Sequence, residues 1–265
     1  ISTDFDGTLV GHPSDGRCVP SLGKALLEAK EEGALWAVNT GRSLEHAVEG
    51  LEIFDAPVAP DFLLTLEREI HEADGRGGWR EFGDWNRICR ERHDALFDES
   101  SGVLAQLADR FATFPDVTLI EEEGRLVGLV TVDEPVMDRV AAELVKFRTI
   151  FPELAYQRNT IYLRFCHRDY DKGSALAELT RSLGVAAEDV FAAGDHFNDL
   201  SMLCPEVAAW LGCPSNAIPE VKQAVERGDG FVSKRPAGEG VAEALGALRK
   251  RKKEKPAAAF AKPPA

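Results

Sequence analysis

The sequence predicts an α/β fold, in which a doubly wound parallel sheet built from two chain segments carries an inserted α+β domain. Residues 1–66 alternate short apolar runs with amphipathic segments, as strands and helices do in a parallel sheet. From residue 67 to 167 the chain is first polar and Gly-rich and then follows a hairpin pattern, and the alternation of strand and helix returns over 168–250. These observations predict a discontinuous core domain with a lid between its two halves.

The first core segment is expected to hold three strands and two helices. The opening strand ends near Asp4, and the helix "PSLGKALLEAKEEG" has Ser21 as its expected N-cap and Gly33 at its end. The elements that follow are the strand "ALWAVNT", the helix "GRSLEHAVEGLE" and the strand "APDFLLTLE".

The inserted segment reads as a small α+β domain. Alternating residues on both sides of a Glu-Gly-Arg turn in "VTLIEEEGRLVGLVTV" predict a hairpin. Two helices are expected, one at 103–114 and one in "PVMDRVAAELVKFRTIF", together with strands near Leu154 and in "TIYLRFC".

The second core segment continues the parallel sheet. It is expected to contain the helix "KGSALAELTRSLG", the strand "EDVFAAGD", a helix opening at "NDLSMLC", the strand "VAAWLG", and the helices "IPEVKQAVERG" and "GEGVAEALGALRK". Residues 251–265 are rich in Lys, Ala and Pro, and this composition predicts a disordered basic tail.

Composition limits the classes of function. The 265-residue chain is 44% hydrophobic and 29% charged, and no apolar run approaches the roughly 20 residues of a membrane span, so we expect a cytoplasmic protein. Its five cysteines form no C-x-x-C pair and are expected to be reduced thiols. Residues 249–265 hold seven basic residues and one acidic residue, which leaves a net charge of −20 on the rest. Such a body repels nucleic acid and anionic membranes, so an anion site must gather its positive charge locally.

Two carboxylates lie one residue apart in the opening stretch "ISTDFDGTLVG". Alternate side chains of a strand point the same way, so Asp4 and Asp6 can converge just past the strand's end. Their repulsion has to be offset by a bound cation, a shared proton or a basic side chain.

Four loops of the core carry the polar residues of a site. Ligands of open α/β sheets bind at the carboxyl ends of the strands. The loops with candidate residues are "DFDGT" after the first strand, "TGRS" after the second, "DKGSAL" at a helix start and "GDHFND" after the strand that begins at Val190.

These four motifs, in this order, resemble those of the haloacid dehalogenase superfamily of phosphohydrolases, and the resemblance covers nearly the whole chain except the tail. It implies that Asp4 is a nucleophile that forms an aspartyl-phosphate, which splits one hydrolysis into two steps. It also implies that Asp6 is the general acid and then the general base. Dehalogenases of the superfamily lack this second Asp, so Asp6 favours a phosphate substrate.

A hard-cation site is expected beside Asp4. Asp195 at the tip of a neighbouring strand, with Asp199 one turn later, supplies the all-oxygen donors that suit Mg²⁺. The resemblance implies that the Mg²⁺ ligands are the Asp4 carboxylate, the Asp6 carbonyl and the Asp195 carboxylate, with Asp199 as a ligand or a neighbour of one. The cation would offset the repulsion among these carboxylates.

The phosphate is expected to be held by donors from three loops. Thr40 and Gly41 stand at a helix N-terminus, Lys172 supplies a positive charge, and Asn198 supplies an amide. Arg42 is predicted either to contact substrate or to cap its helix. His196, next to Asp195, is expected to point away from the site.

The insert has the position and content of a type IIB cap, and it is similar to that of the Cof-like and sucrose-phosphate phosphatases. Many members have Asn-Gly or Gly where this chain has "LERE" at 66–69. The resemblance implies a Mg²⁺-dependent phosphomonoesterase that acts on a small phosphate ester, in particular a sugar phosphate. Two alternatives stay open: a phosphosugar mutase, and a protein that binds a phosphometabolite without catalysis. The sequence names neither the individual substrate nor the oligomeric state.

Overall fold

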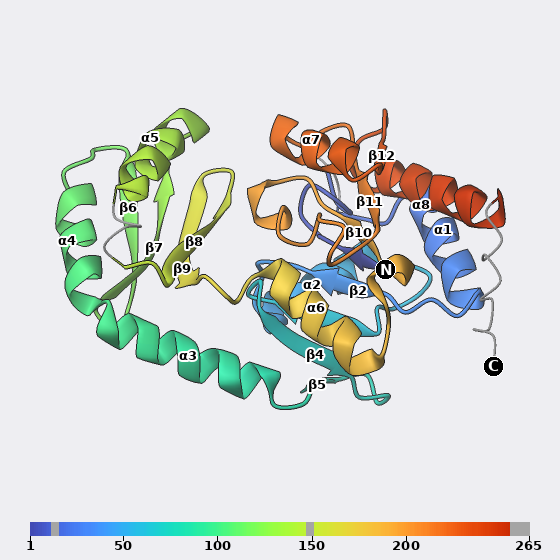
Figure 1. Cartoon of the computed structure of the whole chain (residues 1–265), viewed down its shortest axis with the longest axis horizontal. Coiled ribbons are helices and arrows are strands. Elements are labelled where there is room, and N and C mark those ends of the chain that lie inside the picture. The colour runs from blue at the N-terminus through green and yellow to red at the C-terminus, as the bar shows by residue number, and fades with distance from the viewer. Residues whose placement is uncertain (12–15, 147–150, 255–265) are drawn as a thin grey trace, which may run out of the picture.

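The computed structural model describes residues 1–11, 16–146 and 151–254, which form two lobes side by side (Figure 1). The larger lobe is built on an eight-stranded sheet. Its strands, in spatial order, are β12 (Phe231–Val232), β11 (Trp210–Cys213), β10 (Phe191–Ala193), β1 (Ser2–Thr3), β2 (Ala37–Asn39), β3 (Phe62–Thr65), β4 (Glu69–Ala73) and β5 (Trp79–Glu81).

The register of this sheet brings distant loops to one edge. β1 pairs in parallel with both β10 and β2, with Thr3 opposite Ala193 on one side and opposite Val38 on the other. The chain leaves all three strands at the same edge of the sheet, which is where the loops of a parallel sheet form ligand sites. The loops that begin at Asp4, Thr40 and Gly194 are therefore neighbours.

Helices cover both faces of the core sheet, which confirms the predicted doubly wound α/β class. On one face α6 (Lys172–Leu183) and α7 (Pro219–Arg227) bury apolar side chains that include Leu176 and Val221. On the other face α1 (Pro20–Glu31), α2 (Leu44–Phe54) and α8 (Ala237–Glu254) do the same with Leu22, Ala47 and Val241 among them.

The smaller lobe has a four-stranded antiparallel sheet in the order β6 (Val117–Glu122), β7 (Arg125–Thr131), β9 (Tyr162–His167) and β8 (Leu154–Asn159). β6 and β7 form the predicted hairpin. Helices α3 (Trp85–Glu99), α4 (Ser101–Phe111) and α5 (Glu134–Val145) share one hydrophobic core with this sheet. We call this lobe the cap.

The boundary between the lobes differs from the predicted one at residue 67. β4 and β5 were expected in the cap, but they extend the core sheet as antiparallel edge strands next to β3. The cause is a tight turn after Thr65, which folds β4 straight back onto β3. The chain crosses to the cap through α3, which runs below the cap to the edge of the core in Figure 1, and it returns to the core between β9 and α6.

α3 is also a helix that the sequence patterns did not predict. Its buried positions have helical spacing, but three of the four, Asn86, Cys89 and His93, are polar or weakly apolar, and only Leu96 is aliphatic. A pattern of apolar residues is therefore too weak to reveal this helix.

Three smaller predictions were wrong. Helix α1 begins at Pro20 with Val19 as its N-cap, because proline suits the first helical position, and Ser21 lies inside the first turn. The stretch "NDLSMLC" forms only the short 3₁₀ helix η2 (Phe197–Asp199). The tail was expected from residue 251, but α8 continues to Glu254; residues 255–265 lie outside the described part.

A cluster of rings lies where α3 passes the end of β9, beside the connection from the cap to α6. The Nδ1 atom of His93 lies 2.9 Å from the Cys89 carbonyl oxygen, and its Nε2 accepts a hydrogen bond from the backbone N–H of His167. The rings of His93, His167 and Tyr170 lie with centroids 5.1–6.2 Å apart. Burial lowers the pKa of His93 to about 4, and a protonated ring could no longer accept the His167 hydrogen bond.

Because the ring of His93 is buried and neutral, we expect the protein to lose stability in acid. The pKa of histidine is about 6.5 in the unfolded chain, so the unfolded state takes up a proton that the folded state rejects between about pH 6.5 and pH 4. The stabilisation is complete above pH 6.5 and is lost as the pH falls toward 4. Between pH 7 and pH 5 the free energy of unfolding should fall by about 2 kcal/mol more in the natural protein than in His93→Gln, as measured by urea denaturation. The exposed His46 provides the control His46→Gln, and equal pH slopes for all three proteins would contradict this explanation.

Candidate active site

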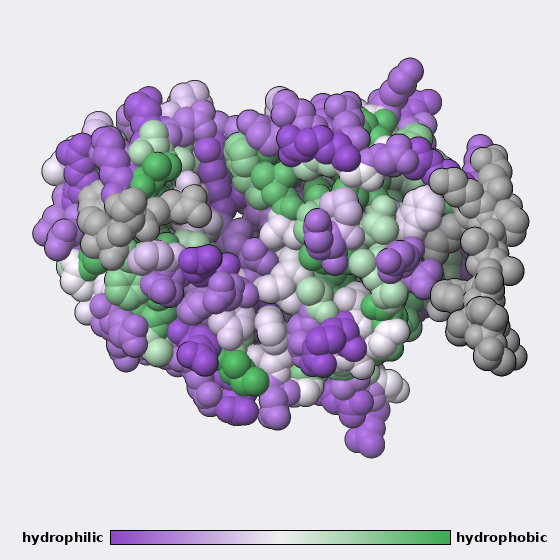
Figure 2. All heavy atoms as spheres, viewed as in Figure 1, coloured by the Kyte–Doolittle hydropathy of each residue, from purple (hydrophilic) through white to green (hydrophobic). Residues whose placement is uncertain are grey.

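Three of the four predicted loops line one cavity between the lobes, and the fourth places Lys172 in contact with Asp4 of that lining. The cavity has a volume of about 780 Å³ and reaches Asp4, Asp6, Thr40 and Asp195. The space-filling view shows the molecule hollowed between its two lobes (Figure 2). The cap contributes lining residues from all four of its strands and from the β8–β9 turn, namely Ile120, Val127, Gly128, Gln157, Asn159, Thr160, Tyr162, Leu163, Arg164 and Cys166.

A buried lysine links the loops of Asp4 and Asp199. Lys172 is fully buried, and its ammonium donates to Asp4 Oδ1 at 2.6 Å and to Asp199 Oδ1 at 2.7 Å. Its position is fixed by the capping box at the start of α6, where Asp171 and Ser174 exchange hydrogen bonds. Burial alone would favour the neutral amine, but the carboxylates of Asp199 and Asp4 raise the pKa of Lys172, so the ammonium stays charged.

Three carboxylates from separate loops converge beside this lysine. Oxygen atoms of Asp4, Asp195 and Asp199 lie within 4.8 Å of one another. Burial raises the pKa of Asp4 well above its usual range and, together with the charge of Asp199, raises the pKa of Asp195 to about 7. Gly7 permits the close approach, because it has φ +85° and a Cβ there would lie 2.3 Å from Asp195 Oδ2.

The carboxylates differ in how much of their hydrogen-bonding capacity is used. Asp199 accepts from Lys172 at Oδ1, and at Oδ2 from the backbone N–H groups of Asp195 and His196. Asp195 accepts from the Thr8 hydroxyl at Oδ1. Within the described part of the chain, neither Asp4 Oδ2 nor Asp195 Oδ2 accepts a hydrogen bond. These two oxygens are hard donors of the kind that a divalent cation prefers, whereas both oxygens of Asp199 already accept hydrogen bonds.

Asp6 is paired with Arg42 at the rim of the cavity. The guanidinium donates from Nε and Nη2 to the two carboxylate oxygens at 2.8 and 2.6 Å, and both side chains are about 30% exposed. Arg42 also packs on the ring of Phe5 and donates to the His46 carbonyl. Arg42 lines the cavity as a substrate contact would, but its charge is directed at Asp6.

The predicted phosphate donors lie around one residue that the sequence analysis missed. Asn198 donates its amide to Glu67 Oε1 at 2.8 Å, and Glu67 also lies against Gly41. Thr40 is buried, and its hydroxyl accepts from the backbone N–H of Arg42. Glu67 carries no motif of its own, but its place in "LERE" between β3 and β4 was the one departure noted from the family pattern.

His196 does not point away from the site. Its ring is buried and lines the cavity, and the backbone N–H of Thr160 lies 3.2 Å from its Nε2. The neighbouring Phe197 carries the Arg158 guanidinium over its ring at 4.8 Å, and Asp138 pairs with the same arginine. The β8–β9 turn of the cap thus rests directly on the loop that holds Asp195.

No helix in the described ranges 1–11, 16–146 and 151–254 is both long and apolar enough to cross a membrane.

Comparisons with known proteins agree with the fold. A family model described as haloacid dehalogenase-like hydrolase matches residues 125–245. The chain is 26% identical to the 5-amino-6-(5-phospho-D-ribitylamino)uracil phosphatase YcsE of Bacillus subtilis, over 92% of this chain and 93% of that one. It is 40% identical to a phosphoglycolate phosphatase of Methanothermobacter thermautotrophicus, over 28% of this chain and 31% of that one.

Solved structures show the same fold at lower identity. The sucrose-phosphatase of Synechocystis, determined with sucrose and phosphate, matches with a TM-score of 0.66 and 18% identity, over 94% of this chain and 96% of that one. This likeness covers both lobes, so the combination of core and cap is shared.

The buried lysine predicts a stability effect. Lys172→Met would leave two buried carboxylates without their cation, so we expect the free energy of unfolding in metal-free buffer to fall by about 3–5 kcal/mol at pH 8, as measured by urea denaturation. The loss should shrink at pH 5, where the carboxylates can take up protons. Lys24→Met, which removes an exposed i,i+4 pair with Glu28, should cost less than about 1 kcal/mol. A Lys172→Met protein as stable as this control would show that the lysine does not hold the site together.

Proposed function

We propose that the chain is a haloacid dehalogenase-like phosphatase that hydrolyses a small phosphate monoester with Mg²⁺, through an aspartyl-phosphate on Asp4. The observation that carries the proposal is the pair of Asp4 and Asp195 oxygens without protein hydrogen bonds, at the floor of a cavity and beside the Lys172 ammonium. A nucleophile, a cation site and a fixed positive charge are thereby adjacent.

In the first step we assign the attack to Asp4. One carboxylate oxygen bonds to phosphorus while the bond between phosphorus and the leaving oxygen breaks. The leaving oxygen takes a proton from Asp6 and departs as an alcohol, and Asp6 is left as a carboxylate. Lys172 stays charged throughout and stabilises the negative charge on the transferring group.

In the second step Asp6 works in reverse. It takes a proton from a water molecule, whose oxygen attacks phosphorus and releases phosphate with Asp4 regenerated. To reach either proton, Asp6 must leave its ion pair with Arg42. Asp6 and Arg42 are each about 30% exposed at the rim of the cavity, which makes that exchange feasible, and Arg42 can pair with the carboxylate that Asp6 carries between the two steps.

The proposed Mg²⁺ site consists of Asp4 and Asp195, with the Asp6 carbonyl as a further ligand and Asp199 as the residue that shapes the loop. When bound, the cation would neutralise the carboxylates and the entering phosphate. The raised pKa values of Asp4 and Asp195 support this assignment. A raised pKa means that the ionised carboxylate is destabilised at this site, and a bound cation would remove that destabilisation.

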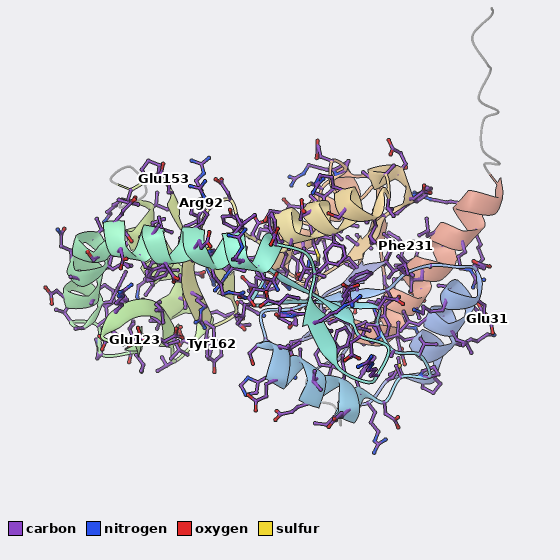
Figure 3. The ribbon with its side chains drawn as sticks, turned by 90° about the horizontal axis from the view of Figure 1, so that it is seen from below. Glu31, Arg92, Glu123, Glu153, Tyr162 and Phe231 are labelled. Atoms are coloured by element: carbon purple, nitrogen blue, oxygen red, sulfur yellow. The ribbon has the colours of Figure 1, made fainter. Side chains whose placement is uncertain are left out.

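We propose a polar leaving group of the sugar type. The cap side of the cavity offers the amides of Gln157 and Asn159, the ring of Tyr162 and the guanidinium of Arg164 (Tyr162 is labelled in Figure 3). Arg164 is paired with Glu122 at 2.6 Å, so its charge is balanced without a second anion on the substrate. Hydroxyl groups and a flat face suit this surface. The named relatives act on phosphate esters of ribitylaminouracil and of glycolate, which supports a small metabolite.

Substitution of Asp4 tests its proposed role as the nucleophile. Asp4→Asn should lower phosphate release with Mg²⁺ by at least about 10³-fold, because the amide oxygen cannot form the ester intermediate. The measurement is phosphate release from a panel of sugar phosphates, phosphoglycolate and nucleotides, with EDTA as the metal-free arm.

The matched control is Asp229→Asn, which makes the same change at an exposed position on the far side of β11 from the site. An Asp4→Asn protein with turnover near that of the control would refute the role of Asp4. Conversion of a hexose 1-phosphate into its 6-phosphate, in place of phosphate release, would favour the mutase.

A further inference from the structure

The turn between β3 and β4 has an unusual backbone. Leu66 and Glu67 follow one another with φ of +49° and +63°, in the left-handed region that costs an L-residue with a side chain roughly 1–2 kcal/mol. Such strain persists where the surroundings impose it, and it gathers at functional sites.

Two hydrogen bonds impose this conformation. The backbone N–H of Leu66 donates to the Arg42 carbonyl at 2.9 Å, and that of Glu67 donates to the Thr40 carbonyl at 3.1 Å. The turn therefore clamps the loop that begins at Thr40, which is one of the proposed phosphate-binding loops.

The same conformation directs the Glu67 side chain into the cavity. Its Oε1 accepts the Asn198 amide at 2.8 Å and lies 3.1 Å from the point that a Cβ on Gly41 would occupy. The Lys172 ammonium is close enough to oppose the rise in the pKa of Glu67 that burial causes. Gly41, Lys172 and Asn198 are three of the four residues to which we assign the phosphate.

We propose that Glu67 is a built-in competitor of phosphate, a carboxylate that occupies part of the phosphate subsite and thereby weakens the binding of phosphate esters and of the product. The proposal rests on the proposed function, because it requires a phosphate ester as substrate, and it takes the residues expected to hold the phosphate, Thr40, Gly41, Lys172 and Asn198, as the phosphate subsite.

The physical reason is that two anions compete for one set of donors. A phosphate oxygen that approaches the Asn198 amide meets the Glu67 carboxylate already bound there, and the two negative charges repel each other. Glu67 thus lowers the affinity of the site for phosphate and favours release of phosphate after each turnover.

The test compares Glu67→Gln with the natural protein. Glutamine keeps the size of the side chain and an oxygen that can accept from Asn198, and it removes only the charge. The dissociation constant of inorganic phosphate with Mg²⁺ is measured by titration calorimetry, and its inhibition constant and the KM for the best ester are measured by turnover. We expect Glu67→Gln to bind inorganic phosphate about 10-fold more tightly and to have a lower KM.

The matched control is Glu52→Gln, which removes the same charge from an exposed position on α2 and should leave all three constants unchanged. Glu67→Gly is a second variant that suits the positive φ, so it keeps the turn and frees the Asn198 amide. It should also bind phosphate more tightly, and thermal melting verifies that each variant is folded.

The opposite result has a definite meaning. If both Glu67 variants are folded and active but bind phosphate no more tightly than the control, Glu67 only orients Asn198 and the inference is wrong while the phosphatase proposal stands. If the natural protein and all variants neither bind phosphate nor hydrolyse any ester, both proposals are overturned.

Discussion

The ion pairs of Lys172 with Asp4 and Asp199 are the interaction on which the site depends. They join a residue of the first loop to one that lies almost two hundred positions later, inside a region where a lone charge would be very costly. The positive charge of Lys172 neutralises only part of the negative charge of the clustered carboxylates. The negative charge left on Asp4 and Asp195 is the reason that a divalent cation fits beside them.

The cap contacts the loop of the core that holds Asp195. It rests on the Asp195 loop through Thr160 and Arg158, so that the surface that would contact the leaving group is held against the loop proposed to hold the cation. Where α3 passes the end of β9, the buried ring of His93 accepts a hydrogen bond from the backbone of His167.

Much of the core could be predicted from the sequence. Its strands are short apolar runs between amphipathic helices, and local patterns reveal such elements. The path of β4, the helix α3 and the role of Glu67 could not be predicted in this way. β4 belongs to the core because a tight turn folds it onto β3, and α3 buries Asn86 and His93, whose polarity hides the helical stripe. Glu67 is an ordinary surface residue type until the turn directs it inward.

The sequence by itself determined the fold class and the set of loops that carry acidic, basic and hydroxyl groups, because strand order and hydrophobic period are local properties of the chain. Only the tertiary structure decided which partner each group has. Lys172 bridges Asp4 and Asp199. Arg42 forms an ion pair with Asp6, and the Asn198 amide donates a hydrogen bond to Glu67. These pairings join residues from 27 to 168 positions apart, and their distances depend on the packing of both lobes, which no local pattern encodes.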